Sequence, residues 1–133
     1  NSTINTYDST SEQFIILNIK IYNLKSFNFL NNTLIALKNN NLLTSYNIQN
    51  DNIFWKIDLS KFLSNKDLII NSYAFNNTVL IFFSTGKIIH LKKLNGDILF
   101  KQNLKLKNVN LINIKDNYFI FYQENGKVFF YKQ

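Results

Sequence analysis

The stretch that decides the fold is Asn76–Leu104, NNTVLIFFSTGKIIHLKKLNGDILFKQNL, in which short apolar runs alternate with turn residues. The run Val79–Phe83 is followed by Ser-Thr-Gly-Lys, the run Ile88–Leu91 is followed by Leu-Asn-Gly-Asp, and an outgoing segment starts at Ile98. Asn-Gly between two apolar runs is a strong hairpin signal, because a type I′ turn needs positive φ at both central residues. The stretch therefore predicts three short strands joined by two tight turns.

The same pattern occurs twice more in the chain. Asn31–Leu59 matches Asn76–Leu104 without a gap at a shift of 45 residues, and Trp55 then falls on Phe100. A third copy begins at Asp116, at a shift of 40 residues, and the sequence ends inside it. A gap-free match of apolar runs, turns and the terminal aromatic residue indicates a true structural repeat.

Repeats of about 40–45 residues with four short strands are the signature of β-propeller blades. Each repeat needs one more strand, which we expect at Leu68–Ala74 and at Val109–Ile114, and Phe14–Leu17 falls where the outgoing strand of a preceding repeat would lie. The middle strands of a blade are covered on both faces, so they should be continuously apolar, while the outermost strand should be more polar. Val79–Phe83 and Ile98–Leu104 fit these two descriptions.

The sequence therefore predicts an all-β fold of about three blades, each of four antiparallel strands, that together form a partial propeller. This propeller is expected over residues 14–133, with repeats at about 31–59, 76–104 and 116–133, after a flexible polar segment at residues 1–13. A propeller typically closes with 4–8 blades. We therefore expect either a fragment of a longer propeller or a partial ring that is completed by association.

The unit G-x-I-x-x-L-x-x-L-N-G-D-I-L-F at Gly86–Phe100 resembles the repeat of the pyrroloquinoline-quinone-type (PQQ-like) propellers. In that family a turn of the form T-G-K ends one strand, and a later strand carries Trp. Asn95-Gly96-Asp97 with Phe100 fits the pattern, whereas Asn50-Asp51-Asn52 with Trp55 fits less closely because it lacks Gly. The family includes quinoprotein alcohol dehydrogenases with eight blades and a quinone. It also includes the propeller lipoprotein of the bacterial outer-membrane-protein assembly machinery, a scaffold without a quinone.

The positive charge of the chain comes from lysine alone. All 15 basic residues are Lys, and the formal net charge is +7. Together with the abundant Asn, Ile and Phe, this composition is typical of an AT-rich genome. Arg is the residue that pairs bidentately with guanine and phosphate, and the lysines are spread along the chain, so we interpret them as a solvated basic surface. Contact with nucleic acid or an anionic membrane is the alternative, and we expect no nucleic-acid partner.

The sequence contains no predicted catalytic, cofactor-binding or metal-binding residue. Cys is absent, and the single histidine, His90, cannot build a multi-His metal site, so we interpret it as a packed or surface side chain. Trp55 and Phe100 occupy equivalent positions and are expected to pack between blades. The carboxylates form no acid/base pair at close spacing, and Asp51, Asp97, Asp116 and Glu124 fall in predicted turns, where we expect them to bond the local backbone. The eight carboxylates are Asp8, Glu12, Asp51, Asp58, Asp67, Asp97, Asp116 and Glu124.

These observations favour a non-enzymatic propeller scaffold for protein–protein interaction, without a cofactor. It would bind a protein partner or a second copy through rim loops or exposed blade edges. The resemblance implies a periplasmic or outer-membrane-associated location in a bacterium. No apolar run approaches the roughly 20 residues that a spanning helix needs, so no transmembrane segment is expected. The alternative is a fragment of a PQQ-dependent quinoprotein dehydrogenase, which would need a quinone, a calcium ion and a catalytic Asp.

Overall fold

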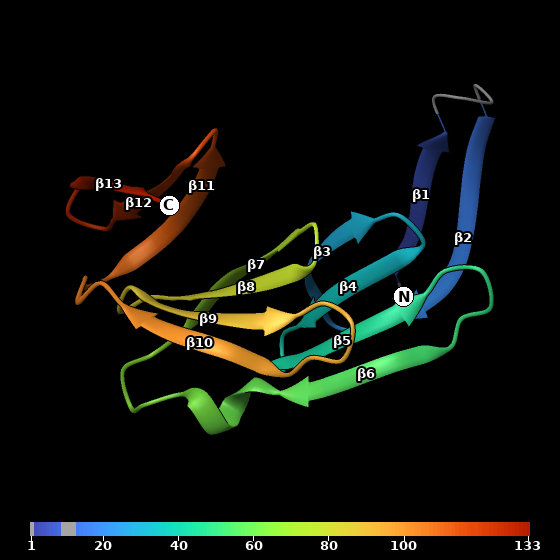
Figure 1. Cartoon of the computed structure of the whole chain (residues 1–133), viewed down its shortest axis with the longest axis horizontal. Coiled ribbons are helices and arrows are strands. Elements are labelled where there is room, and N and C mark those ends of the chain that lie inside the picture. Colours follow the sequence, from blue (N-terminus) through green and yellow to red (C-terminus); the bar gives the residue numbers. More distant parts are fainter. Residues whose placement is uncertain (1, 9–12) are drawn as a thin grey trace.

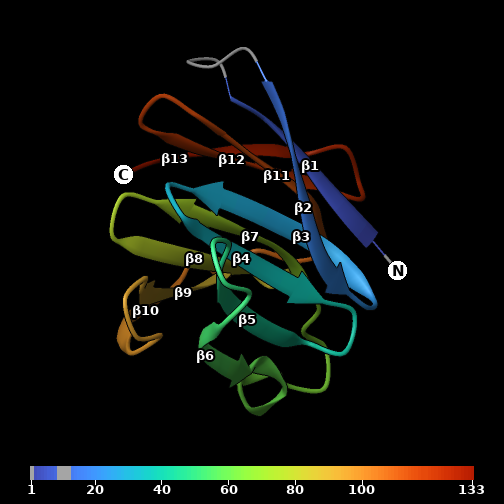
Figure 2. The same cartoon turned by 90° about the vertical axis from the view of Figure 1, so that its right-hand side faces the viewer.

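The computed structural model describes residues 2–8 and 13–133, with side chains from Ile21 onward. Within these residues the chain is nearly all strand, and its only helical element is a 3₁₀ turn, η1 (Leu59–Phe62). Three antiparallel sheets follow one another, with the second between the first and the third (Figures 1 and 2). The predicted all-β partial propeller of four-stranded blades is confirmed, and we refer to the three sheets as the first, second and third blades.

The strands of each blade pair in chain order, so hairpins connect them. The first blade contains β3 (Leu24–Leu30), β4 (Thr33–Lys38), β5 (Leu42–Asn47) and β6 (Ile53–Asp58). The second blade contains β7 (Ile69–Phe75), β8 (Thr78–Phe83), β9 (Lys87–Lys92) and β10 (Ile98–Asn103). The third blade contains β11 (Val109–Lys115), β12 (Tyr118–Gln123) and β13 (Val128–Lys132).

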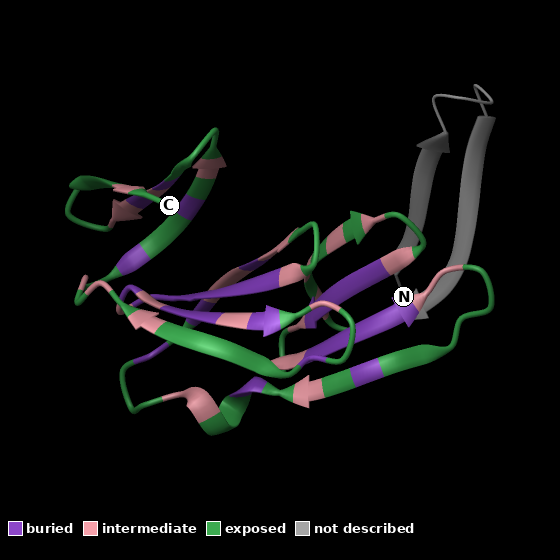
Figure 3. Cartoon of the chain, in the orientation of Figure 1, coloured by how far each residue is buried: buried purple, intermediate pink, exposed green. Residues whose placement is uncertain are grey.

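Burial follows the position of a strand in its blade, as the apolar pattern predicts. Along β4, β5 and β8 most residues are buried, and along β9 half are, because neighbouring sheets cover both faces (Figure 3). The outer strands β6 and β10 are mostly exposed. Continuous apolar runs therefore mark the middle of a blade, and mixed runs mark its outer edge.

Among the strands of the three blades, β3 is the one that the sequence does not predict. Its polar residues Ser26 and Asn28 are half-buried, whereas Phe27 and Phe29 are exposed, which is the reverse of an ordinary amphipathic strand. The Asn28 amide explains this arrangement: its Nδ2 donates to Ser72 O at 2.8 Å, and its Oδ1 accepts from Ala74 N at 3.2 Å. The side chain thus joins the inner strands β3 and β7 where the first two blades meet.

The interfaces between blades form the core of the molecule. One apolar cluster joins the first blade to the second and includes Leu43, Trp55 and Phe83, and another joins the second to the third around Phe82 and Phe119. Trp55 on β6 is 9% exposed, and its Nε1 donates to Lys93 O, at the β9–β10 turn, at 2.7 Å. Trp55 therefore packs between blades as expected. Its counterpart Phe100 is 49% exposed.

Three hairpin turns share the same backbone conformation and the same hydrogen bond. Asn41, Gly86 and Gly126 each have positive φ, and each donates its backbone N–H to the carbonyl three residues earlier. Asn41 does in the first blade what glycine does in the other two, because Asn tolerates the left-handed region better than most residues.

The prediction of a type I′ turn at Asn95-Gly96 is wrong. Among these two residues only Gly96 has positive φ, at +75°. Gly96 N donates to Lys92 O and Lys92 N donates to Asp97 O, both at 2.8 Å, so the loop is wider than two residues. The Asn-Gly pair still marks a hairpin, and Trp55 packs closely against Gly96 in this longer loop.

The N-terminal segment, for which the sequence predicts a flexible tail, contains a strand, and its flexibility stays a prediction. Ser2–Asp8 forms strand β1, which pairs antiparallel with β2 (Gln13–Ile21). The backbone hydrogen bonds of a partner strand can hold such a segment despite its polar composition, and its Thr and Ile residues favour strands. Residues 1 and 9–12, including Glu12, lie outside the described residues. A domain boundary at residue 14 stays a prediction.

Candidate functional site

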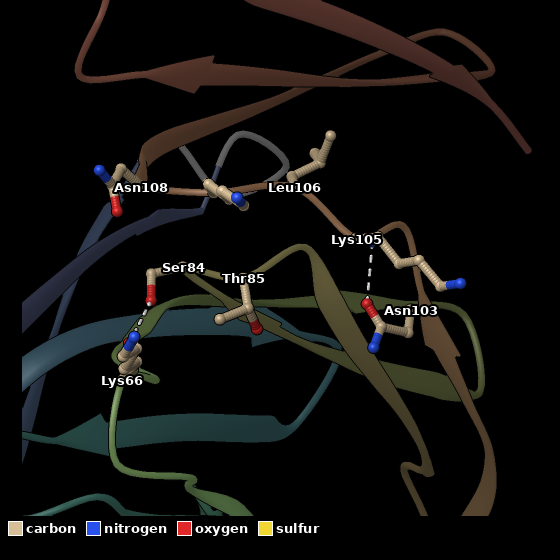
Figure 4. Close-up of a pocket in the computed structure, with 8 residues that line it drawn as sticks. Lys66, Ser84, Thr85, Asn103, Lys105, Leu106 and Asn108 are labelled. Carbon is tan, nitrogen blue, oxygen red and sulfur yellow. Dashed lines mark hydrogen bonds between the residues drawn. The ribbon is translucent and has the colours of Figure 1, made fainter.

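The candidate site lies at the end of the blades where the second and third sheets meet. A cleft of about 460 Å³ opens there between the Ser84-Thr85 turn and the connection from β10 to β11 (Figure 4). Lys66 and five residues between Asn103 and Asn108 complete its lining. Figure 4 shows the segment that carries Leu106 and Asn108 across the cleft from Ser84 and Thr85. Loops at one end of a rigid sheet scaffold are a common place for binding.

The connection from β10 to β11 is held across the turn by its backbone. Leu104 N donates to Gly86 O at 3.0 Å, and Val109 N donates to Ser84 O at 2.9 Å. Gly86 has φ of +77°, and a Cβ at this position would lie 2.9 Å from Leu106 Cβ, so only glycine fits without a shift. The two hydrogen bonds and this close contact set the shape of the cleft.

A partly buried ion pair, Lys87–Asp67, is bonded to the Thr85 turn. The Asp67 carboxylate accepts hydrogen bonds from Lys87 Nζ and Thr85 Oγ1, and from Ser64 N at 3.2 Å. Burial alone would raise the pKa of Asp67, but these hydrogen bonds outweigh it and lower the pKa to about 2. Lys87 also donates to Phe62 O and lies over the Phe83 ring. Asp67 is therefore ionised and fully occupied by partners within the protein.

The mouth of the cleft is strongly basic. Lys66, Lys105 and Lys107 are exposed and line it, and none of its lining residues is acidic. Within residues 21–133 the one ion pair is Lys87–Asp67. The three lysines at the mouth therefore carry charge that no carboxylate among the described side chains neutralises.

The backbone of Lys105 is unusual for this chain. It has φ of +52°, in the left-handed region. Every other non-glycine residue described with positive φ is Asn or Asp, the residue types that adopt this conformation at least cost. The Asn103 side chain contributes to this loop, because its Oδ1 accepts from Lys105 N at 2.9 Å.

His90 lies on the face of the second blade toward the third. Its ring stacks on Phe100 with 3.9 Å between centroids, and its Nε2 lies 2.9 Å from Gln102 Oε1. Gln102 Nε2 in turn donates a hydrogen bond to Tyr131 Oη at 3.3 Å. Burial lowers the pKa of His90, and the hydrogen bond to Gln102 acts in the opposite direction. These contacts place His90 in packing between blades and away from the cleft lining.

Most of the described carboxylates lie in turns or at element ends. Asp51 and Asp116 have positive φ in hairpin loops, and Asp58 caps η1 by accepting from Ser60 N at 2.9 Å. Asp97 accepts from Asn95 Nδ2 at 2.7 Å. Asp67 differs, since its partners come from Lys87 and Thr85, far along the chain. Within the described residues no group of three or more His, Cys, Asp or Glu side chains could hold a metal ion.

Sequence reasoning missed the cleft residues and the role of Asp67. The T-G-K turn at Thr85–Lys87 was a signal, because it supplies two partners of Asp67, but the sequence does not show which acid meets it. In the sequence the Lys105-Leu106-Lys107 run only precedes the strand expected at Val109–Ile114. Nothing in that run shows that Lys105 adopts positive φ or that the run lies across another turn.

Comparisons with known proteins identify the fold. No protein-family model matches the chain, and no curated protein sequence does. The crystal structure of BamB from Moraxella catarrhalis is similar over 95% of this chain, with a TM-score of 0.67 and 14% identity, and the chain spans 37% of that protein's length. The chain therefore has the fold of part of a BamB-like propeller.

Two computationally designed proteins share the architecture. Ika4 matches over 98% of this chain with a TM-score of 0.63 and 16% identity, and the match covers 79% of Ika4. Ika8 also matches over 98% of this chain, with a TM-score of 0.62 and 16% identity, and the match covers 40% of Ika8. At these identities the likeness concerns the fold alone. In the part of the chain that the structure describes, no helix has the length and apolar character to cross a membrane.

Proposed function

We propose that this chain is a non-enzymatic β-propeller scaffold that binds protein partners during outer-membrane-protein assembly, at the periplasmic face of a bacterial outer membrane. The observation that carries this proposal is the similarity to BamB over nearly the whole chain. The three blades also offer what a scaffold needs. They form a rigid core of packed sheets and present turns at both ends of the blades.

Exposed apolar side chains provide candidate contact surfaces for such partners. Leu94 at the β9–β10 turn is 85% exposed, and Phe130 on β13 is 67% exposed. Val128 and Phe130, two residues apart on β13, are both exposed, and large apolar side chains that lie together on a surface often mark protein interaction sites.

The proposal is tested by capture of the assembly machinery. The purified chain, immobilised beside M. catarrhalis BamB, is incubated with detergent-solubilised outer membranes from M. catarrhalis cells that lack their own BamB. We expect components of the assembly machinery, identified by mass spectrometry, to bind both proteins. If BamB retains these components and the chain retains none of them, the scaffold proposal for this machinery is wrong.

A further inference from the structure

We propose that the cleft between the second and third blades binds an acidic segment of a protein partner, with the carboxylates of that segment paired to Lys66, Lys105 and Lys107. This inference deepens the scaffold function and rests on it. It names the chemistry that a partner must present at this end of the blades.

The mouth of the cleft carries positive charge that favours an anionic ligand. The three lysines are exposed at the mouth, and no acidic residue lines the cleft. Asp67, which lies under the Ser84-Thr85 turn, is already bonded to Lys87, Thr85 and Ser64. The positive charge at the mouth is therefore available to an external anion, in a protein whose net charge is already +7.

The backbone conformation of Lys105 also points to a need for lysine at this position. A residue other than Gly is strained in the left-handed region, and Asn and Asp are strained least. The chain places Asn or Asp at each of the other described non-glycine positions with positive φ, including Asn108 on the same loop. Lys105 is the exception, and its backbone gives no reason for a lysine. An ammonium group that is needed at the mouth of the cleft does give one.

The shape of the site favours an extended segment over a small anion. In Figure 4 the Lys105 side chain extends outward from the mouth, and Lys66 lies on the other side of the Thr85 turn. Ammonium groups spread around an open cleft suit several carboxylates along a chain. The NH2 group of Asn103 can still donate, because its Oδ1 is the atom that binds Lys105 N.

Two other polyanions fit this site less well. Nucleic-acid grooves combine basic groups with aromatic side chains on which bases stack, and no aromatic residue lines this cleft. A membrane surface would contact the projecting ends of the loops and leave a concave site unfilled. A protein segment with Asp or Glu at successive positions can enter the cleft and reach the lysines at its mouth.

The experiment measures the binding of a fluorescently labelled octaglutamate peptide by anisotropy, with an octaglutamine peptide as reference. We expect the K66Q/K105Q/K107Q variant to weaken octaglutamate binding about tenfold, as three exposed ion pairs would allow. The matched control is K56Q/K92Q/K115Q, which removes the same number of charges from exposed positions outside the cleft. Equal weakening by the two variants would show a general charge effect and overturn the inference.

A single substitution separates binding from folding. The K105N variant places the residue type that the rest of the chain uses at positive φ, so its stability in urea should equal or exceed that of the wild type. We nevertheless expect it to weaken octaglutamate binding about twofold or more. Unchanged binding by K105N would contradict the role of Lys105, as would tighter binding of a single-stranded oligonucleotide with the same number of charges.

The inference and the scaffold function can fail separately. If the wild type and K66Q/K105Q/K107Q both capture the assembly machinery equally and octaglutamate does not bind, the acidic-segment site is wrong and the scaffold function stands. If octaglutamate binds at the cleft but no component of the machinery is captured, the cleft chemistry stands and the proposed machinery is wrong.

Discussion

Truncation of Trp55 tests the idea that the blades are joined by side chains from their outer strands. Trp55 lies on β6 of the first blade and contacts the second blade at the β9–β10 turn, where a Cβ on Gly96 would lie 3.0 Å from its ring. Its Nε1 donates to Lys93 O. Trp55→Ala should therefore loosen the junction between two blades as well as remove apolar contacts.

The magnitude follows from burial. Trp55 is 9% exposed, so its truncation should cost about 3–5 kcal/mol, as for other buried aromatic residues. Part of this cost, about 1 kcal/mol, is the lost hydrogen bond. Phe100 holds the equivalent position in the second blade but is 49% exposed. Phe100→Ala should therefore cost only about 1–1.5 kcal/mol, roughly half of the value for a fully buried side chain.

The assay is urea unfolding followed by far-UV circular dichroism, which does not depend on the lost tryptophan. We expect the free energy of unfolding of Trp55→Ala to fall at least about 1.5 kcal/mol below that of Phe100→Ala, from the values above. Trp55→Phe keeps a ring and should fall between them, which provides a measurable variant if Trp55→Ala does not fold. Equal losses for the two alanine variants would refute the role of Trp55 as a contact between blades.

Three further predictions concern the supports of the fold, each followed by urea unfolding. Because the pKa of Asp67 is lowered to about 2, its stabilisation is complete above pH of about 4 and is lost as the pH falls toward 2, and Asp67→Asn should remove this acid-dependent loss, on the order of 2 kcal/mol. Gly96→Ala should destabilise the chain by at least about 1 kcal/mol more than Gly126→Ala, because both have positive φ but only the first Cβ meets other side chains, at 2.8–3.0 Å. Asn28→Ala should cost about 1–2 kcal/mol because two hydrogen bonds between inner strands are lost, whereas the exposed Asn113, at the equivalent position of β11, should tolerate alanine within about 0.5 kcal/mol. An Asp67→Asn protein that retains the acid-dependent loss, or equal effects within either pair, would contradict these assignments.

The strands that sequence reasoning located are those whose burial is decided by the repeat itself. Val79–Phe83 and its counterparts are apolar because sheets cover them on two sides, so the pattern appears in the sequence wherever the blade does. Strand β3 is not predicted from the sequence because its inward face is polar. The side-chain amide of Asn28 finds its hydrogen-bond partners on β7 of the next blade. Strand β1 is not predicted because its polar composition is typical of a loop. It forms a strand through its backbone pairing with β2.

The candidate site could not be predicted in the same way. Lys66 and Lys105 are far apart in the sequence, and each alone is an ordinary surface lysine. They line one cleft because the connection from β10 to β11 is bonded to Ser84 and Gly86. The similarity to BamB describes the fold and leaves this loop unassigned.

By itself the sequence determined the repeat, the four-strand plan and the positions of the hairpins. All of these depend on local alternation of apolar and turn residues, which recurs at fixed spacing. Only the tertiary structure decided which polar side chains are satisfied between blades, that Asp67 is held by Lys87 and Thr85, and that three lysines share a cleft. The physical reason is that each of these depends on contacts between segments whose separation in space is set by the packing of whole sheets.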